Sequence, residues 1–575
     1  MSSTAFSADA IHAAAAEAHL PSRSAHVSIA DERLADHPFL PLLDRLHGPA
    51  PRLRDAHGLR DGDALRAEID ACAAAMRASG AQRIASRLDN GGDWVVLDLA
   101  IRMLGLVHVP LPTFFSEDQI AHALRDSGAD ALVCIAAHIA AHASPHTIAP
   151  DAAAHEAAVE QGTHALGPRL RLQPLTAAEV ALPAGTAVIT YTSGTTGTPK
   201  GVCLDAATLM TVAQSLADAA APLSPQRHLC LMPLSTLLEN VAGVYAALLA
   251  DAEIVAPSLA EIGYTGAAGL DVPTLIACLH RHRPHSAILV PQLLLALTMA
   301  AERGVALPDS LRFLAVGGAR VGESLIARAD AVGLPVYEGY GLSECGSVVC
   351  LNRPGARRAG SVGRALPHVR VQVGEGTHAG ELLVDGPRWL GYLGDAPPPA
   401  GPVATGDLGY IDVDGYVYVT GRKKHVFITA FGRNVSPEWV ESELQQHPDI
   451  AQAVVFGEAR PFNVAVVWPR RAEADTTALQ AALDAVNRRL PDYAQVRVAI
   501  RADAPFSSAD GTLTANGRPR REAIFARHRS AIDAQYAPSL AASTDALTDT
   551  SIEASIEASM DTTPISQRHP HGVTA

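Results

Sequence analysis

Cysteine and positive charge are both scarce in this sequence of 575 residues. Its seven cysteines are scattered, odd in number and never spaced as C-x-x-C, which argues against a disulfide framework or a zinc site and favours the reducing cytoplasm. Lysine and arginine number 45 against 60 aspartates and glutamates, a net charge of −15. This balance disfavours a general nucleic-acid binder and is typical of a soluble protein.

Long hydrophobic runs are missing as well. The apolar stretch 286–301 is shorter than a bilayer span and contains Pro291, so it indicates a buried strand followed by a core helix. The Ala-rich beginning carries Asp9 and Glu17 but no lysine or arginine before Arg23, which does not fit a secretory signal. We therefore expect no transmembrane segment and no export, with peripheral membrane contact and the oligomeric state left open.

Apolar residues make up 48% of the chain, enough for more than one core at this length. Up to about residue 365, short β-branched runs alternate with Ala- and Leu-rich stretches of helical length, which predicts α/β architecture with buried sheets. Residues 1–35 are expected to form a loose arm. The strands predicted in this region are 95–97, 131–133, 187–190, 287–290 and 313–316.

Beyond residue 365 the pattern changes to short alternating strands and turns, in which Asp414-Gly415 predicts a hairpin. A smaller α+β segment follows at 421–536. Residues 537–575 repeat Ser-Ile-Glu-Ala, and their polar, low-complexity composition is typical of a disordered tail. The strands expected in the middle region are 369–373, 381–384, 410–412 and 413–419.

The segment Thr192–Gly201, Thr-Ser-Gly-Thr-Thr-Gly-Thr-Pro-Lys-Gly, gathers hydroxyls, glycines and one cation directly after a predicted strand. Gly194 and Gly197 allow backbone N–H groups to converge on an anion, and Lys200 adds a mobile positive charge. Pro199 stands where a Walker loop needs its second glycine, so this is a different phosphate loop. A Ser/Thr/Gly surface linker is the alternative, but it does not account for the preceding strand. A nucleotide triphosphate is therefore the first ligand to test.

Three further segments, each weak alone, could complete a nucleotide site. Gly339-Tyr340-Gly341 places an aromatic ring between glycines, able to stack on a base, and Glu344 follows as a hard ligand for Mg²⁺. Asp407 can accept both ribose hydroxyls, and Arg422 can join it from the other side. Taken singly, each segment would be interpreted as a solvated turn.

In this order, the four segments resemble the motifs of the AMP-forming adenylating enzymes, the superfamily of acyl- and aryl-CoA synthetases, peptide-synthetase adenylation domains and luciferases. The resemblance covers about residues 40–530 and is closest in type to the fatty acyl-CoA synthetases. Further matching segments are Met232-Pro233-Leu234-Ser235, Val316-Gly317-Gly318-Ala319, Gly380-Glu381-Leu382 and Gly432-Arg433-Asn434-Val435-Ser436-Pro437, followed by Glu441.

The resemblance implies an α/β fold in two parts and a reaction in two steps. A large AMP-binding domain, 36–420, would contain two mixed or parallel sheets sandwiched by helices and a small β-barrel-like subdomain. A small hinged α+β domain, 421–536, would follow. A carboxylic acid, of fatty-acid type, and ATP would give acyl-AMP and pyrophosphate, and a thiol would then take the acyl group. That thiol would be coenzyme A or the phosphopantetheine of an acyl carrier protein.

The resemblance also implies roles for single residues. Tyr340 would stack on adenine, Asp407 and Arg422 would hold the ribose, and the phosphate loop would hold the β and γ phosphates. Cations and Mg²⁺ are needed because attack of a carboxylate on the α-phosphate brings negative groups together. The implied catalytic residues are Lys200, Glu344, Arg518 and Lys424, and Lys424 lies at the hinge. The implied metal ligands are Thr195 and Glu344. Gly432 would border the thiol tunnel. The implied ATP- and AMP-binding residues are Thr192, Ser193, Gly194, Thr195, Thr196, Gly197, Thr198, Lys200, Gly317, Gly318, Gly339, Tyr340, Gly341, Ser343, Asp407 and Arg422.

One position departs from the family pattern at the centre of the chemistry. The family's catalytic lysine, in an Asn-Gly-Lys context, aligns with Asn516-Gly517-Arg518, and sliding the alignment to Arg520 or Arg521 also gives arginine. Arginine keeps the charge, but its planar fork is bulkier than an ammonium. We expect adenylation to survive at a lower rate, with loss of the first half-reaction as the alternative.

The segment after the Met-Pro-Leu-Ser match borders the family's acyl pocket, and it lacks the His…Glu-Arg pattern of many fatty acyl-CoA synthetases. It supplies Thr236, Leu237, Leu238 and Val241 instead. Their small or aliphatic side chains suit an uncharged aliphatic or aromatic acid better than an amino acid. Glu239 is the acidic residue of this segment, and the resemblance implies a structural role for it.

Several histidines and one cysteine are interpreted as structural. His425 stands where Asp or Glu commonly follows the hinge residue and is interpreted as a solvated surface side chain. The series His138, His142 and His146 has helical spacing, but Pro145 interrupts it and no acid is near, so a metal site is disfavoured. A helix end accounts for His280, His282 and His285, and Cys203 is interpreted as a packed small side chain.

Two alternatives to a fatty acid–coenzyme A ligase are kept. The chain could be an acyl-carrier-protein ligase or another acyl-adenylate-using enzyme of a biosynthetic pathway. It could also be a non-catalytic acyl- or nucleotide-binding protein, although the presence of Lys200, Glu344 and Asp407 argues against that reading.

Overall fold

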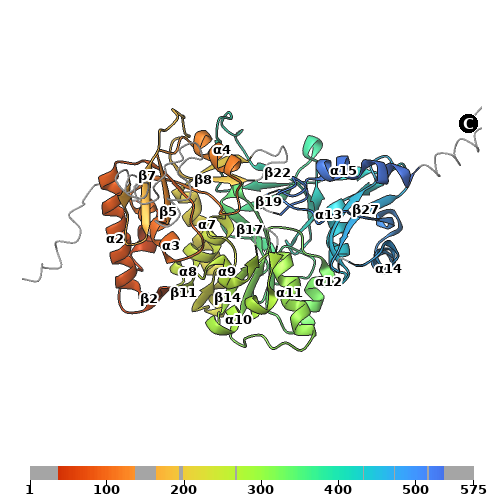
Figure 1. The fold of residues 1–575 in the computed structure, drawn as a ribbon, viewed down its shortest axis with the longest axis horizontal. Coiled ribbons are helices and arrows are strands. Elements are labelled where there is room, and N and C mark those ends of the chain that lie inside the picture. Colours follow the sequence, from red (N-terminus) through yellow and green to blue (C-terminus); the bar gives the residue numbers. More distant parts are fainter. Residues whose placement is uncertain are drawn as a thin grey trace, which may run out of the picture.

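The computed structural model describes residues 37–135, 163–192, 199–265, 269–431, 433–471, 473–514 and 517–536. The predicted arm and tail, the series His138, His142 and His146, loop residues 193–198, and Gly432 lie outside these ranges. The described residues form a large N-terminal domain and a small C-terminal domain, which is the blue end of the ribbon in Figure 1.

Two mixed sheets build the large domain, as predicted. The first comprises β1 (Pro51–Asp55), β2 (Gly58–Asp61), β10 (Arg227–Leu229), β11 (Glu253–Val255), β14 (Ser286–Leu289), β15 (Phe313–Val316), β16 (Val336–Leu342), β17 (Ser347–Leu351) and β18 (Arg364–Ala365). Its strand order is β18-β17-β16-β15-β14-β10-β11-β1-β2. The inner strands are parallel, and antiparallel pairs lie at both edges.

The second sheet has eight strands. They are β3 (Arg83–Ser86), β4 (Val107–Pro110), β5 (Ala131–Ile135), β6 (His164–Ala165), β7 (Leu170–Pro174), β8 (Thr186–Thr192), β9 (Lys200–Asp205) and β21 (Gly391–Tyr392). Their order is β21-β9-β8-β4-β3-β5-β7-β6. The largest buried cluster includes residues from both sheets and from the helices between them, so one core joins the two sheets.

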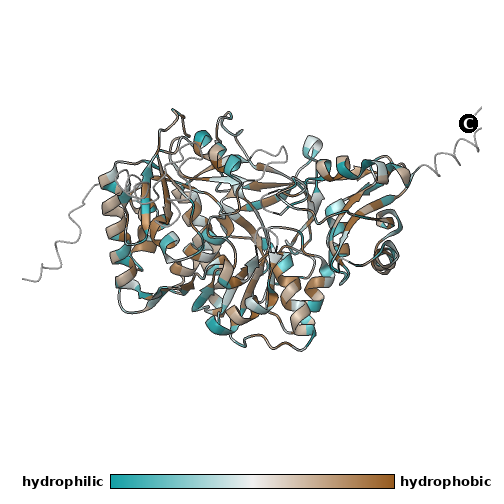
Figure 2. Cartoon of the chain, in the orientation of Figure 1, coloured by the Kyte–Doolittle hydropathy of each residue, from teal (hydrophilic) through white to brown (hydrophobic). Residues whose placement is uncertain are grey.

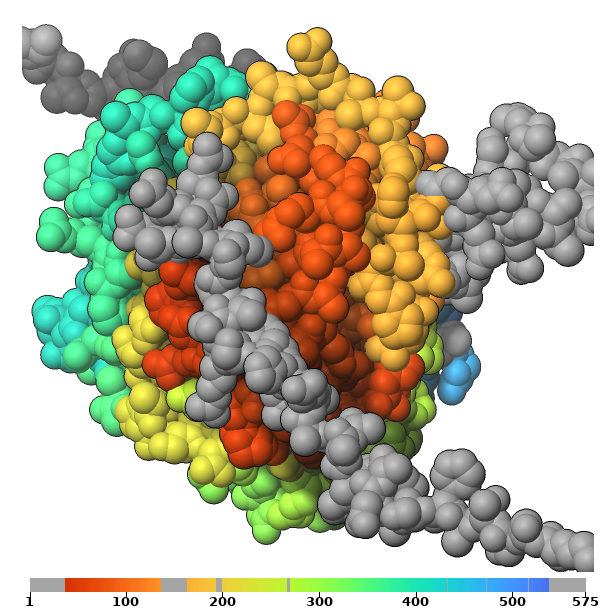
Figure 3. Space-filling view, turned by 90° about the vertical axis from the view of Figure 1, so that its left-hand side faces the viewer, coloured from red at the N-terminus to blue at the C-terminus, as the bar shows by residue number. Residues whose placement is uncertain are grey.

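Helices cover these sheets, and local sequence sets where they begin and end. The longer ones are α2 (Gly62–Ser79), α3 (Gly92–Met103), α4 (Glu117–Ser127), α7 (Ala206–Ala220), α10 (Val272–His282), α11 (Pro291–Glu302) and α12 (Glu323–Ala331). The shorter ones are α1 (Leu40–Leu43), the π-helical turn η3 (Glu239–Tyr245), α8 (Ala246–Leu249) and α9 (Leu259–Ile262). In α4, Ser116 and Gln119 form a capping box, and Gly128 ends the helix at φ +60°. Asp61 caps α2, whose outer side faces the viewer in Figure 3.

One predicted strand is wrong. Residues 95–97 lie within α3, whose residues from Trp94 to Arg102 are all buried. A helix that is apolar on every side shows no period, so the run Val95-Val96-Leu97 could not be distinguished from a buried strand. The other predicted strands are confirmed within a few residues, including 286–301 as β14 followed by α11, except that the predicted strand 413–419 begins only at Val417.

The region after residue 365 forms an open antiparallel sheet in place of the predicted barrel-like subdomain. Its strands are β19 (Arg370–Val373), β20 (Glu381–Asp385), β22 (Val403–Ile411) and β23 (Val417–Arg422), in the order β19-β20-β22-β23. The predicted hairpin joins β22 to β23, with Gly415 at φ +83°. The predicted boundary at residue 420 falls inside β23 and stays a prediction.

The small domain is α+β, as predicted. It contains β24 (Phe427–Ile428), β25 (Asn434–Val435), α13 (Pro437–Gln445), β26 (Ile450–Phe456), β27 (Asn463–Pro469), α14 (Thr476–Asn487), β28 (Val496–Arg501) and α15 (Arg521–Ala534). A three-stranded sheet, β26-β27-β28, carries apolar clusters on both faces. In Figure 2, apolar residues gather inside the molecule throughout the chain, with brown strands inside and more teal on the outer helices. Within the described ranges, no helix combines the length and apolarity that a bilayer crossing requires.

Candidate active site

A hairpin brings the two ends of the predicted phosphate loop together. Strands β8 and β9 pair antiparallel, so Thr192 stands opposite Lys200. Strand β21 pairs with the other edge of β9 and brings Tyr392 and Asp395 to the same place. Lys200 Nζ lies 3.1 Å from Asp395 Oδ2 and 5.1 Å from the centre of the Tyr392 ring. Neither neighbour could be expected from the sequence, because Tyr392 lies in β21 and Asp395 just after it, almost two hundred residues from Lys200.

Tyr392 also reaches the predicted metal ligand. Its hydroxyl donates to Glu344 Oε1 over 2.5 Å, and the backbone N–H of Trp389 donates to the backbone carbonyl oxygen of Glu344 over 2.7 Å. Burial and the Glu344 carboxylate raise the pKa of Tyr392, which keeps its hydroxyl protonated as a donor. Glu344 lies in the 3₁₀ turn η4 (Ser343–Cys345), and its carboxylate oxygens are the hard ligands that Mg²⁺ prefers. This side chain fits a magnesium site, whereas Thr195 lies outside the described residues.

The register of β22 and β23 assembles the predicted ribose site. Asp407 stands opposite Arg422, whose Nε lies 2.7 Å from Asp407 Oδ1. On the other side, the Tyr340 hydroxyl donates to Asp407 Oδ2 over 2.7 Å. Asp407 is 4% exposed, and burial raises its pKa while Arg422 opposes that shift. Three predicted nucleotide residues from three strands are therefore in direct contact.

Glycines keep the wall beside these residues free of side chains. Gly317 and Gly318 follow β15, and Gly318 has φ +80°, a conformation that favours glycine. A Cβ on Gly341 would lie 1.8 Å from the Ser347 carbonyl oxygen, so β17 leaves no room for a side chain there. All three glycines, together with Gly339 and Ser343, line one cavity. This wall lies where parallel strands end, the usual position of ligand sites in α/β sheets.

The small domain contributes the remaining predicted residues. Arg518 Nη2 donates to the Gly318 carbonyl oxygen over 3.0 Å. Desolvation and the nearby Arg422 lower the pKa of Arg518, and Asp407 and Glu344 oppose the shift. Lys424 lines the same cavity, where desolvation and Arg422 lower its pKa. The aligned arginine thus points at the nucleotide wall and carries its charge among the predicted catalytic groups.

The cavity that these groups share has a volume of about 1130 Å³ and extends into the core of the large domain. Thr236, Leu237 and Leu238 line it, as predicted for the acyl pocket. Val241 does not: it is 0% exposed and packs in the core, because its side of η3 faces away from the cavity. The wall residues that the sequence did not reveal include a group of alanines, namely Ala217, Ala220, Ala242, Ala246, Ala247, Ala250 and Ala252.

Two interpretations made from sequence concern residues around the cavity. Glu239 is fully buried and holds the segment after β10, because it accepts from the Met232 N–H over 2.9 Å and contacts His228 Nε2 at 2.9 Å. This agrees with its structural interpretation. His425 was interpreted as solvated, but its Nδ1 contacts the Glu438 carboxylate and its side chain is 30% exposed. The first turn of α13 supplies that partner, which the sequence did not reveal.

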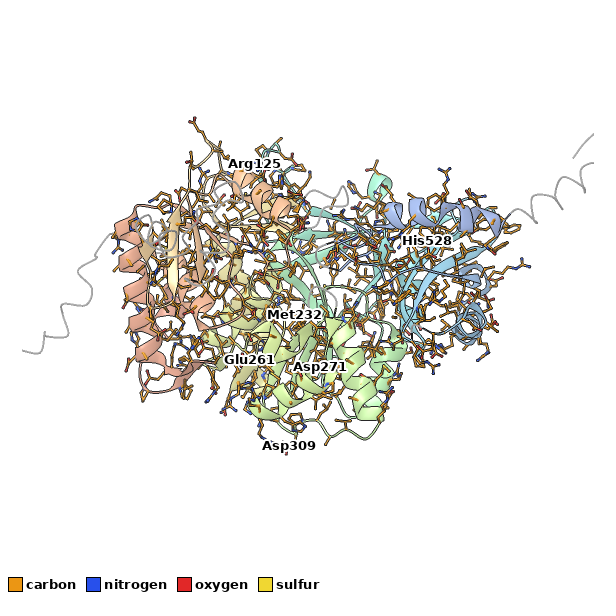
Figure 4. The ribbon with its side chains drawn as sticks, in the orientation of Figure 1. Arg125, Met232, Glu261, Asp271, Asp309 and His528 are labelled. Carbon is orange, nitrogen blue, oxygen red and sulfur yellow. The ribbon has the colours of Figure 1, made fainter. Side chains whose placement is uncertain are left out.

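A second cavity of about 1760 Å³ lies between the two domains. Met232, Tyr264 and Gly318 line it on the large domain, and Trp468 and Arg518 line it on the small one. Figure 4 shows Met232 at the centre of the molecule, at the side of the large domain that faces the small one. The site therefore has two adjoining spaces, one that extends from the small domain into the core of the large domain and one between the domains.

Family models match most of the chain. The model described as AMP-binding enzyme matches residues 62–393, and the one described as AMP-binding enzyme C-terminal domain matches residues 424–539. A long-chain-fatty-acid–CoA ligase of Mycobacterium bovis is 28% identical over 537 residues, covering 77% of this chain and 86% of that protein. Indoleacetate–CoA ligase of Aromatoleum aromaticum is 32% identical over 285 residues, covering 47% of this chain and 54% of that protein.

Solved structures agree at the level of the fold. An anthranilate CoA ligase in complex with anthranoyl-AMP aligns with a TM-score of 0.68 at 18% identity, covering 84% of this chain and 96% of that one. The O-succinylbenzoate coenzyme A synthetase of Bacillus subtilis, in complex with ATP and magnesium ion, aligns with a TM-score of 0.64 at 22% identity, covering 84% and 98%. With its large and small domains and its motifs in place, the chain belongs to the AMP-binding enzyme family of adenylating enzymes.

Proposed function

We propose that this chain is a cytoplasmic, AMP-forming ligase that joins a fatty acid to coenzyme A. Its matched family and the acid–CoA ligases among its relatives support an acyl-adenylate route. The acid is the less determined part, because the names of these relatives include both long-chain fatty acids and an aromatic acid.

In the first half-reaction, a carboxylate oxygen of the acid attacks the α-phosphorus of ATP. The bond from that phosphorus to the bridging oxygen breaks, and pyrophosphate leaves. Lys200 would hold the β and γ phosphates, Asp407 and Arg422 the ribose, and Arg518 the oxygens that gain charge. Mg²⁺ held by Glu344 would neutralise charge on the triphosphate. Each of these side chains acts by position and charge, which is what phosphoryl chemistry requires of a protein.

In the second half-reaction, the sulfur of coenzyme A attacks the carbonyl carbon of the acyl-AMP. The carbon–oxygen bond to AMP breaks, AMP leaves with that bonding pair, and the thiol proton passes to water. The cavity between the domains would admit the thiol, since it shares Gly318 and Tyr340 with the acyl cavity. Lys424, beside β23, is proposed as the hinge for the domain movement.

One observation carries the proposal: the cationic groups and the apolar cavity form a single space. Lys200, Arg422 and Arg518 line the same cavity as Leu237 and Leu238. A carboxylate among the cations therefore has its hydrocarbon part directed into the apolar wall. This arrangement suits an uncharged acyl group. Among the described residues that line the cavity, no acid is buried where it could pair with a substrate ammonium, and the nearby Glu239 is already bound to His228 and Met232.

An ATP–pyrophosphate exchange screen tests the proposal. Butyrate, octanoate, palmitate, benzoate and indoleacetate would each be offered, followed by coenzyme A or a phosphopantetheinylated carrier protein with the best acid. We expect exchange with fatty acids and formation of acyl-CoA with release of AMP. Exchange with no acid would leave a non-catalytic binding protein, and transfer to the carrier protein alone would move the function to an acyl-carrier-protein ligase.

A further inference from the structure

The apolar cavity follows the direction of the strands. The chain leaves the carboxyl end of β10, returns along η3 and α8, and enters β11, which is parallel to β10. The helical segment therefore runs from the nucleotide end of the sheet back to its amino end. Val316 and Gly317 line the cavity at the first end, and Phe313 and Ser286 line it at the other. The cavity thus extends along the whole length of β14 and β15.

Small side chains line the helical side of this space at every level. Ala242, Ala246 and Ala250 succeed one another along η3 and α8, and Ala217 and Ala220 of α7 also line the space. An alanine presents one methyl group, so the space between these helices and the sheet stays open. An extended alkyl chain can pass along such a space.

Two independent measures give similar lengths for the channel. Eight residues separate Ala242 from Ala250, which is about 12 Å at about 1.5 Å per helical residue. From Phe313 to Gly317 along β15 and the residue after it there are four steps, or roughly 13 Å at about 3.3 Å each. With carbon–carbon bonds of about 1.5 Å in a zigzag, about ten carbons of an extended alkyl chain would cover this length.

The far end of the channel lies at the surface. Ala250 is exposed and Ala220 is half-buried, although both line the cavity. The polar groups near this end are satisfied within the wall: His228 Nδ1 contacts Ser286 Oγ at 3.0 Å, and its other ring nitrogen contacts Glu239. His228 therefore offers no unpaired ring nitrogen to a passing hydrocarbon chain.

We infer that the channel takes a long, unbranched acyl chain whose tail leaves the protein beside Ala250. The inference rests on the proposed ligase function and adds the class of acid, since an open end sets no sharp upper limit on chain length. Chains of up to about ten carbons would lie wholly inside, and longer ones would extend from the surface end. Burial of each methylene favours binding only inside the channel, so affinity should rise with length and then level off.

Closing the channel at two depths tests this. Ala246→Phe places a ring midway along it, and Ala250→Trp covers its surface end. The matched control is Ala207→Leu, at an exposed alanine on the first turn of α7. For each variant, kcat/KM for pyrophosphate exchange would be measured with butyrate, hexanoate, dodecanoate and palmitate. Binding of a fluorescent long-chain acid without ATP provides a second readout.

We expect the native chain and the control to have similar kcat/KM values with palmitate and with dodecanoate. In Ala246→Phe, kcat/KM should fall about tenfold or more with dodecanoate and palmitate, since ring atoms would overlap the longer chains. Its kcat/KM with butyrate should stay close to the native value. In Ala250→Trp, kcat/KM should fall most with palmitate and stay unchanged with hexanoate. Retained butyrate activity shows that a variant is folded, and Ala246→Leu repeats the test with a smaller side chain.

The outcomes separate the two claims. Exchange with butyrate or aryl acids but not with palmitate in the native chain would overturn the channel and leave the ligase standing. If kcat/KM depended on chain length in the same way in all the variants, the channel would also be overturned and the ligase would stand. Exchange with no acid at all would instead remove the proposed function, and the fluorescent acid would then still report whether a long chain binds.

Discussion

Arg518 donates a hydrogen bond to the carbonyl oxygen of Gly318 over 3.0 Å and so joins the small domain to the nucleotide wall of the large one. We expect Arg518→Ala to lower kcat for acyl-adenylate formation by about a hundredfold or more, the usual cost of losing one donor aimed at developing charge. Transfer from preformed acyl-AMP to coenzyme A should change little. Single-turnover assays of the two half-reactions measure both.

The variant Arg518→Lys decides how the family position works here. Lysine keeps the charge but offers an ammonium in place of a planar fork, and the contact with the Gly318 carbonyl would have to be remade. We expect a partly active enzyme, between native and Arg518→Ala. Hydroxamate formation measures the first half-reaction. If the native chain forms no hydroxamate and Arg518→Lys does, then this arginine abolishes the first half-reaction.

Asp395 pairs with Lys200 and would compete with a triphosphate for it in the proposed site. The two side chains are both about half exposed, so the pair is screened by water and weak. We expect Asp395→Asn to tighten equilibrium binding of Mg-ATP by about two- to fivefold, because a pair of this kind contributes up to about 1 kcal/mol. Calorimetry without any acid gives the dissociation constant directly.

A matched control for this variant is Asp309→Asn. Asp309 pairs with Arg283 at the surface and lies at the lower edge of the large domain, far from Met232 at the centre (Figure 4). Its substitution should leave ATP binding unchanged. Weaker binding in Asp395→Asn would mean that Asp395 supports the site and does not compete for the lysine.

The residues proposed to bind the nucleotide could be named from the sequence because they lie in short segments that follow one another in the family's order. The loop before Lys200 has a distinctive composition of its own, whereas the glycines around Tyr340 and the polar segment at Asp407 gain meaning only from their order along the chain. Tyr392 and Asp395 could not be found this way, since only the pairing of β21 with β9 places them beside Lys200. The contacts between segments, and so the electrostatics of the site, needed the structure.

The acyl cavity shows a different limit. Thr236, Leu237 and Leu238 were predicted from their place after a motif, and Val241 was added as the next apolar residue. The π-helical geometry of η3 turns Val241 into the core and presents Ala242 to the cavity instead. A helical projection that assumed 3.6 residues per turn would also have misplaced these side chains, because π-helical hydrogen bonds span five residues.

Glu338 gives the stability of the chain a defined pH dependence. It is buried in β16, and burial raises the pKa of its carboxyl to about 8, against the opposing effect of Arg320. Between the ordinary carboxyl pKa and this value the folded state binds more protons than the unfolded state, so stability is full below that range and falls as pH rises through it. Glu338→Gln, which stays neutral, should gain stability over the native chain as pH goes from about 5 to about 8.

Urea unfolding at several pH values measures this difference. The two free-energy curves should converge at the acid end of the range and separate toward pH 8. Parallel curves would show that Glu338 has an ordinary pKa in the folded state. Glu375→Gln, at an exposed glutamate between β19 and β20, serves as the control and should follow the native curve.

A buried ionic cluster holds the helices of the large domain to its sheets. Asp98 on α3 is 1% exposed and accepts from Arg102 over 3.0 Å, from the hydroxyl of Tyr245 in η3, and contacts His108 Nδ1 of β4 at 2.7 Å. Arg102 in turn donates to the carbonyl oxygen of Ala187 at the start of β8. Despite complete burial, these partners hold the pKa of Asp98 well below its usual range.

Asp98→Asn should therefore destabilise the chain by about 3–5 kcal/mol, because it leaves the Arg102 charge buried without its counter-charge. Equilibrium unfolding in urea measures the loss, and Asp70→Asn, at an exposed i, i+4 pair with Arg66, should cost under about 1 kcal/mol. Since Tyr245 closes η3, the variant should also loosen the alanine wall of the acyl channel. Its KM for palmitate should then rise more than its KM for ATP, and an equal rise in both would limit the cluster to holding the fold.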